Sequence, residues 1–176
     1  MSSGSASFLP NIFFRLYASS PRTGLDAALP QYIKNLEGDY SMITGRELTS
    51  EEKEALAKEV RQFLIDNELW TDVRIYFNGK AFSTSDRHGK CFYNDPENLV
   101  VLEDEDPRNY FKYVSDDNIM SMSFEGDFYG CLNFTNEYGA DFDNRIREEF
   151  DDILEKYGVY HELGHPWNLT CCYSWR

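Results

Sequence analysis

Residues 74–83 read RIYFNGKAFS, and this stretch decides the fold class. Two short runs rich in β-forming residues flank Asn78-Gly79, a dipeptide that supplies the positive φ angles of a type I′ turn. The pattern therefore predicts a β-hairpin. Further strands are expected at 11–18, 98–102, 119–124, 159–163 and 169–175, where β-branched and aromatic residues gather or apolar and polar residues alternate.

Three helices are expected. Thr49-Ser50-Glu51-Glu52 is a capping box, because Glu follows Thr by three residues, and the helix that it begins should end near Asn67. Residues 140–157 carry apolar side chains at helical spacing and are followed by Gly158, a good C-cap. A short helix is expected at 30–36, and 127–134 fits either a helix or a strand. The expected buried positions of the two longer helices are Leu56, Val60, Phe63, Leu64, Phe142, Ile146, Phe150, Ile153, Leu154 and Tyr157.

These elements predict an α+β fold, in which one antiparallel sheet carries two or three helices packed on one face. The length of 176 residues suits a single domain over 9–176, with residues 1–8 as a disordered tail. No apolar run approaches the roughly 18 residues that span a membrane, and no signal-peptide pattern is present. We therefore expect a cytoplasmic protein that does not bind membranes, with its four cysteines reduced.

The net charge of −14 is concentrated in one part of the chain. The stretch 95–155 holds 18 acidic and four basic residues, whereas the rest holds 13 of each. Such asymmetry favours a surface of one sign. The acids that we expect to form a partner-binding surface are Glu103, Asp104, Glu105 and Asp106 before Pro107, and Asp141, Asp143, Glu148, Glu149, Asp151, Asp152 and Glu155 in the last helix.

Clustered carboxylates can take the place of phosphates, because duplex DNA carries one charge per ~1.7 Å of its axis. In size, charge and lack of a catalytic motif, the chain is similar to the small acidic proteins that phages and mobile elements use against restriction and CRISPR nucleases. This similarity implies a DNA mimic of the anti-CRISPR or antirestriction class. We expect it to bind a basic nucleic-acid-binding protein, such as a nuclease, and not nucleic acid itself. The alternative is an adaptor with an apolar interface, on which the acids serve only solubility.

A five-residue match offers a different function. His161-Glu162-Leu163-Gly164-His165 fits H-E-x-x-H and so resembles zinc proteases, which implies a zinc-dependent hydrolase using His161, Glu162 and His165. However, Pro166 disfavours helical angles at His165, and the stretch predicts a strand instead. On a regular strand both histidines share a face about 13 Å apart, too far to hold one ion. Cys171 or Cys172 could complete a structural zinc site, but we expect no metal, no cofactor and no catalytic residues.

Overall fold

The computed structural model describes residues 45–133 and 144–176, all within one compact unit, Glu37–Arg176. The described residues contain the sheet, three α-helices and the C-terminal hairpin. Some sequence predictions cannot be compared with it. The tail 1–8, the strand 11–18, the helix 30–36, and the residues 140–143 with Phe142, Asp141 and Asp143 lie outside the described residues.

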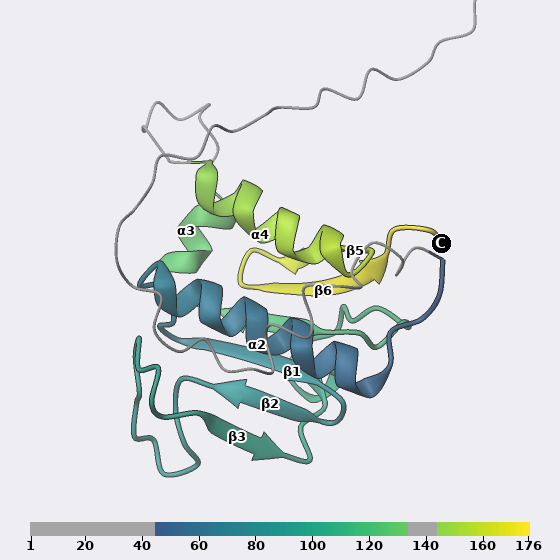
Figure 1. The fold of residues 1–176 in the computed structure, drawn as a ribbon. Helices are drawn as coiled ribbons and strands as arrows, with labels where there is room; N and C mark the ends of the chain where they lie inside the picture. Colours follow the sequence, from purple (N-terminus) through teal and green to yellow (C-terminus); the bar gives the residue numbers. More distant parts are fainter. Residues whose placement is uncertain (1–44, 134–143) are drawn as a thin grey trace, which may run out of the picture. The chain divides into compact units, whose positions relative to one another are not determined.

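Six strands form one antiparallel sheet in the order β3-β2-β1-β4-β6-β5 (Figure 1). The predicted hairpin is confirmed: its turn residues Asn78 and Gly79 have φ angles of 48° and 74°, as a type I′ turn requires. The predicted C-terminal hairpin is confirmed as β5 and β6. The strands are β1 (Val73–Phe77), β2 (Lys80–Ser83), β3 (Val100–Glu103), β4 (Ser121–Phe124), β5 (Val159–His165) and β6 (Asn168–Tyr173).

The helices begin and end at local signals. α2 (Ser50–Asp66) follows the capping box, where the Thr49 Oγ1 accepts from the Glu52 amide at 3.3 Å and the Glu52 carboxylate accepts from the Thr49 amide at 2.8 Å. α4 (Arg145–Lys156) is followed by Gly158, whose φ of 67° permits the C-terminal turn. The ambiguous stretch forms a helix, α3 (Asp127–Asn133), and a short 3₁₀ helix, η2 (Pro107–Asn109), precedes β4.

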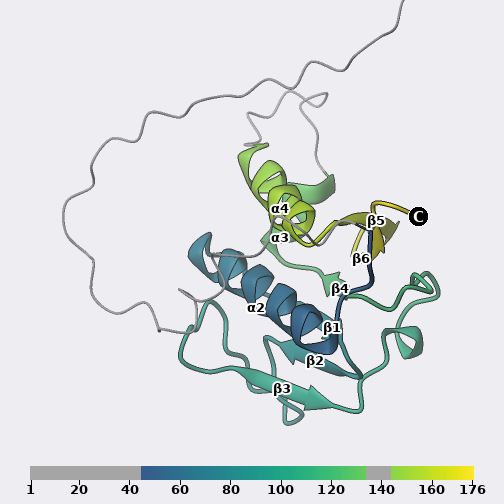
Figure 2. The same ribbon diagram turned by 45° about the vertical axis from the view of Figure 1, so that its right-hand side comes forward.

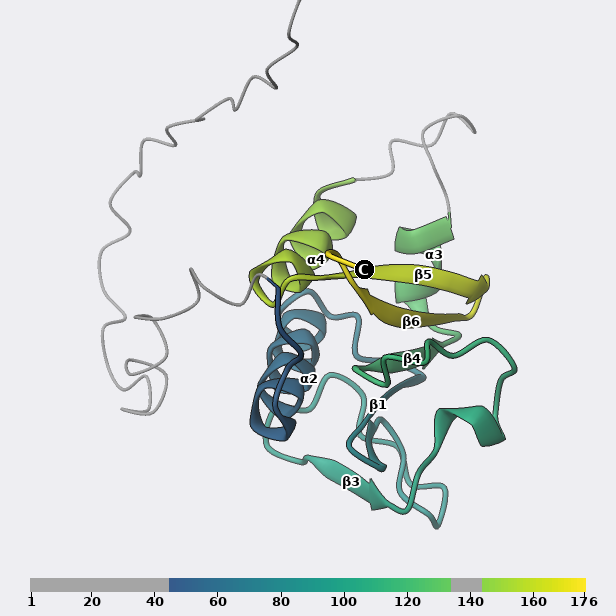
Figure 3. The same cartoon turned by 90° about the vertical axis from the view of Figure 1, so that its right-hand side faces the viewer.

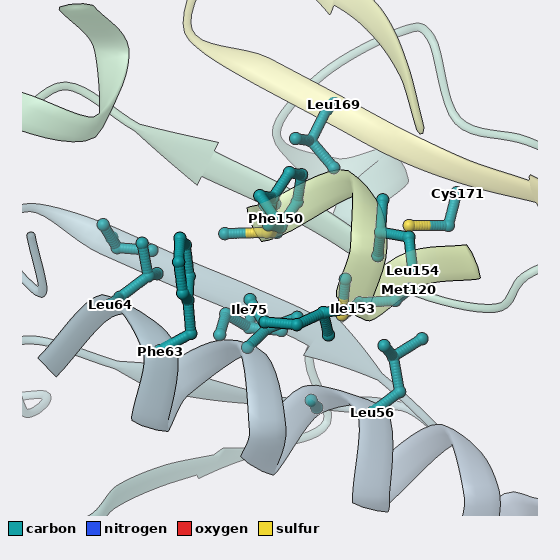
Figure 4. Close-up of a cluster of buried hydrophobic side chains, with 14 of the residues drawn as sticks. Leu56, Phe63, Leu64, Ile75, Met120, Phe150, Ile153, Leu154, Leu169 and Cys171 are labelled. Carbon is teal, nitrogen blue, oxygen red and sulfur yellow. The ribbon is translucent and has the colours of Figure 1, made fainter. Parts of the chain in front are cut away.

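The helices pack on one face of the sheet, as predicted (Figure 2). The core lies between them and the sheet, and all of its labelled side chains in Figure 4 are buried. Phe150 of α4 is central: its ring lies 6.3 Å from that of Phe63 on α2 and 5.3 Å from that of Phe128 on α3. Each such fully buried apolar side chain contributes roughly 1.5–3 kcal/mol. Packing of the three helices on one another therefore depends on this ring.

The other face of the sheet is covered only in part. Tyr76 of β1 and Ala81 of β2 form a small second cluster there with Phe111, which belongs to the segment that connects β3 to β4. Figure 3 shows that segment on one side of the strands and α2 with α4 on the other. This face is open enough to hold a pocket, which is described below. Among the described residues, no helix is long and apolar enough to cross a membrane.

Candidate functional site

The acids of α4 divide into two groups by their contacts. Glu149 pairs with Arg145 at 3.0 Å, and Asp151 contacts the imidazole of His161 at 3.0 Å. The other three, Glu148, Asp152 and Glu155, are exposed, and they have no ion-pair partner among residues 45–133 and 144–176. They are spaced four and three residues apart and so lie in one row along the helix. We call this row the α4 stripe.

The α4 stripe borders a groove that no single segment of the sequence predicts. The groove lies between α2 and α4 and has a volume of about 500 Å³. Its apolar part is Phe63 and Ile153, which are 8% and 7% exposed. Four carboxylates and one ammonium also line it: Glu59 and Asp66 from α2, and Glu149, Asp152 and Lys156 from α4. We call it the α2–α4 groove.

One ion pair ties the two walls of the groove together. The Lys156 ammonium lies 2.6 Å from Glu59, whose second oxygen accepts a hydrogen bond from the Tyr157 hydroxyl at 3.0 Å. At the C-terminal end of α2, Asp66 accepts a neutral hydrogen bond from Gln62 at 2.7 Å and has no ion pair with another described residue. The groove thus keeps an excess of negative charge beside an apolar floor. Such a surface suits a basic side chain with a long aliphatic stem.

The acidic corner of Glu103 to Asp106 lies apart from the α4 stripe. It follows β3, the edge strand farthest in the sheet order from β5, against which α4 packs. Two of its acids have local roles. Glu105 accepts from the Tyr110 hydroxyl at 2.5 Å, and Asp106 caps η2 by accepting from the Arg108 amide at 2.9 Å. Of the two acidic segments predicted from the sequence, only the one in α4 reaches the groove.

The zinc-protease pentapeptide lies in strand β5, as the sequence predicts. His161 is paired with Cys171 on the helix-covered face, whereas Glu162 is paired with Thr170 on the other face. A bulge between Leu163 and His165 then shifts the register, so His165 is paired with Asn168. The prediction that both histidines share a face is therefore wrong, because the regular alternation breaks at this bulge.

The candidate metal ligands are consequently divided between the faces. Cys171, next to His161, is fully buried, and burial raises the pKa of its thiol. Glu162 accepts hydrogen bonds from the Tyr113 and Tyr160 hydroxyls, and these bonds lower the pKa of its carboxyl. Within residues 45–133 and 144–176, no three His, Cys, Asp or Glu side chains are placed to hold a metal ion. This geometry gives the zinc-hydrolase hypothesis no support.

Comparison with known proteins supplies no relative on which function could be based. No protein-family model, no curated protein and no solved structure matches this chain. Only the residues of the site itself therefore bear on its function.

Sequence reasoning missed the α2 wall of the groove. Glu59 and Asp66 are seven residues apart, a spacing that puts them on the same side of a helix, with Phe63 between them. That pattern was readable in the sequence. What the sequence could not show is that this side of α2 faces Glu149 and Asp152 across the groove, because the contact depends on how the two helices pack.

Proposed function

We propose that this protein is a non-enzymatic inhibitor that binds a basic nucleic-acid-binding protein. The partner class that we favour is a nuclease of the restriction or RNA-guided type. The protein would present carboxylates where that partner normally holds phosphates. The observation that carries the proposal is the α4 stripe: Glu148, Asp152 and Glu155 are exposed in one row and are not neutralised by a described cation.

The spacing of these charges supports phosphate mimicry. With a rise of 1.5 Å per residue, the three carboxylates follow one another at about 6 Å and about 4.5 Å along the helix axis. Phosphates of one DNA strand follow one another at about 3.4 Å. The stripe alone thus has more than half the linear charge density of a single strand. Glu149, in the groove wall beside the stripe, is paired with Arg145 at 3.0 Å and is not counted in this density.

The α2–α4 groove adds an anchoring element to this charge. Charge complementarity raises association rates and excludes wrong partners, but a stable complex also needs buried apolar contacts. Phe63 and Ile153 offer such contacts on the floor of the groove. A lysine or arginine from a phosphate-binding surface could place its aliphatic stem on them and its charge against Asp66 or Asp152. The same surface would be unfavourable for DNA itself.

The test is affinity capture from nuclease-treated bacterial lysate, with mass spectrometry to identify the partner. The groove variant is Glu148→Lys with Asp152→Lys. Its matched control is Glu103→Lys with Asp104→Lys, which changes the net charge equally at the opposite edge of the sheet. We expect the wild type and the control to retain a nucleic-acid-binding protein that the groove variant loses.

Two further measurements decide the mechanism. Duplex DNA added to the complex should displace the protein, and binding should weaken steeply as the salt concentration rises. Equal loss in both variants would mean that only net charge matters. A partner retained by the groove variant and at high salt would contradict the proposal and favour an adaptor with an apolar interface.

A further inference from the structure

The sheet face opposite the helices carries a second pocket, separate from the α2–α4 groove. Its volume is about 400 Å³, within the range of small-molecule sites. The pairing of the strands determines which polar residues lie side by side on this face. Arg74 on β1 is directly opposite Ser123 on β4, and Ser123 is directly opposite Asn168 on β6. Directly opposite residues lie about 5 Å apart, so three hydrogen-bond donors form a row across this face.

These donors are largely unused. The guanidinium of Arg74 has no hydrogen bond or ion pair with any other described residue and lies 5.8 Å from the centre of the Tyr110 ring. The hydroxyl of Ser123 also has no hydrogen-bond partner within the described part of the chain. Asn168, the third residue of the row, is fully buried and does not line the pocket itself, and its Nδ2 also has no partner among the described residues. An arginine without an ion pair in the described part of the chain is notable on a protein with 31 acids, because its guanidinium could accommodate an anionic group.

Aromatic side chains form the walls of the pocket and are held in place by neighbours. Trp167 is stacked on His165 at 5.7 Å and contacts the Phe111 ring edge-on at 6.0 Å. Tyr110 is fixed by its hydrogen bond to Glu105 and by the Tyr76 ring at 5.6 Å. Because these rings are fixed before any ligand arrives, they can bind a planar apolar group without a large loss of conformational freedom.

Two carboxylates complete the lining at one end of the pocket. Asp72 precedes β1 and Glu125 follows β4, and the backbone joins them through a hydrogen bond of 3.1 Å from the Glu125 amide to the Asp72 carbonyl. Their charge disfavours a ligand with several negative charges, such as a phosphate. It favours a ligand that also carries a positive group. The lining therefore has one cation, two anions and the rings of Tyr76, Tyr110 and Trp167. The ring of Phe124, the fourth aromatic residue there, packs in the core against Phe128.

We propose that this pocket binds a free aromatic α-amino acid. The carboxylate of the ligand lies on Arg74 and Ser123, its ammonium lies toward Asp72 and Glu125, and its ring packs on Tyr76, Tyr110 and Trp167. This arrangement uses both signs of charge and the aromatic walls. It does not depend on the function proposed for the α2–α4 groove, because the two sites lie on opposite faces of the sheet.

The test is titration of the ¹⁵N-labelled full chain with L-phenylalanine, followed by amide chemical shifts. We expect changes confined to residues 72–76, 123–125 and 167, with a Kd on the order of 1 mM, as few contacts would give. Arg74→Gln should weaken binding about tenfold, since a charge-assisted hydrogen bond is lost. The exposed Arg87, outside the pocket, supplies the matched control Arg87→Gln, which should bind like the wild type.

Two analogues test the assignment of the charges. Phenethylamine lacks the carboxylate and should not bind detectably, and 3-phenylpropionate lacks the ammonium and should bind more weakly than L-phenylalanine. Arg74→Gln keeps the wild-type fold if its remaining amide shifts are unchanged. The proposal is overturned if L-phenylalanine causes no localised shifts, if Arg74→Gln binds as the wild type does, or if phenethylamine binds equally well.

Discussion

His161 is on β5 and its imidazole faces α4. Its surroundings act on the pKa of this imidazole in opposite directions. Burial lowers the pKa of its imidazole, and the nearby Arg147 lowers it further, whereas the Asp151 carboxylate at 3.0 Å raises it. Burial is the largest of these effects, because the imidazole side chain is only 10% exposed while the carboxylate is half exposed and screened by water. The fold therefore favours the neutral imidazole, with Nδ1 donating to Asp151.

This lowered pKa makes a prediction about stability against pH. Below the ordinary histidine pKa of about 6.5, the imidazole is protonated in the unfolded chain but stays neutral in the folded protein until the pH is lower. The stability due to neutral His161 is thus present above about pH 6.5 and is lost as the pH falls toward the lowered folded-state value. As the pH falls from about 7.5 to about 5, the unfolding free energy of His161→Gln should therefore decrease less than that of the wild type. Urea denaturation across that range measures it.

The control for this prediction is His88→Gln, in an exposed turn. Comparing the two variants separates the effect of this buried position from the effect of removing any histidine. Carboxyl groups whose pKa is lowered, such as those of Glu52 and Glu54, affect stability only at lower pH, near and below about 4.5. The two windows are therefore separable. Parallel profiles for His161→Gln and the wild type would show that burial of this imidazole does not govern its titration.

At the scale of elements, the capping box of α2 allows a matched comparison. Thr49→Ala removes the hydroxyl that accepts from the Glu52 amide, while the reciprocal bond from the Thr49 amide remains. We expect a loss of about 1 kcal/mol in unfolding free energy, as for other N-cap substitutions. Ser50→Ala, at the first helical position, removes an exposed hydroxyl that caps nothing and should be neutral. Equal urea midpoints for both variants would refute this role of Thr49.

Helix starts, turns and helix ends were predictable where a short sequence motif determines the backbone. The capping box, the Asn78-Gly79 turn and the C-cap at Gly158 each fix the backbone through residues near in sequence, and each was found as predicted. The stretch 127–134 had no such signal. It is helical because Phe128 and Leu132, four residues apart, are both buried on one side, with Phe128 packed against Phe124 and Phe150. Packing on α4, which is distant in the sequence, and on the end of the preceding strand β4 decided its state.

The bulge in β5 is a second feature that the sequence alone could not predict, and it affects the candidate metal ligands. Gly164 lies within it, and a Cβ there would be 2.8 Å from the Asn168 side chain and 2.9 Å from the Cβ of Tyr113. Glycine permits this close approach. The sequence shows the glycine but not the loop that covers it. The sequence spacing predicts that His161 and His165 are too far apart to share one ion, but it could not predict that they lie on opposite faces of the sheet.

At the scale of the whole molecule, the acids of the stretch 95–155 that the structure describes do not gather on one surface. Glu103 ends β3 and Asp104 follows it at one edge of the sheet, whereas α4 packs near the other edge. Two acids outside that third, Glu59 and Asp66 of α2, instead share the groove with α4. The strand order thus separates acidic segments that are close in the sequence. The packing of α2 on α4 brings together acids that are far apart in the sequence.

The α4 stripe should lower the stability of the protein that carries it, because like charges repel and no described cation offsets them. Neutralising it with Glu148→Gln, Asp152→Asn and Glu155→Gln should raise the Tm at about 20 mM NaCl, where screening is weak. We expect a rise of about 2–4 °C, the shift that 1 kcal/mol gives in a domain of this size. At about 500 mM NaCl the difference from the wild type should shrink, because the Debye length falls below the spacing of the charges.

Glu54→Gln is the contrasting variant. Glu54 pairs with Lys58 at 2.8 Å and with Lys80 at 3.3 Å, so its neutralisation should not raise the Tm at low salt. Thermal denaturation of the three proteins at both salt concentrations gives the comparison. If the stripe variant is more stable yet fails to capture the partner, the repulsion is a cost that binding requires. If it is no more stable than the wild type, the stripe is adequately solvated, and its charge does not oppose folding.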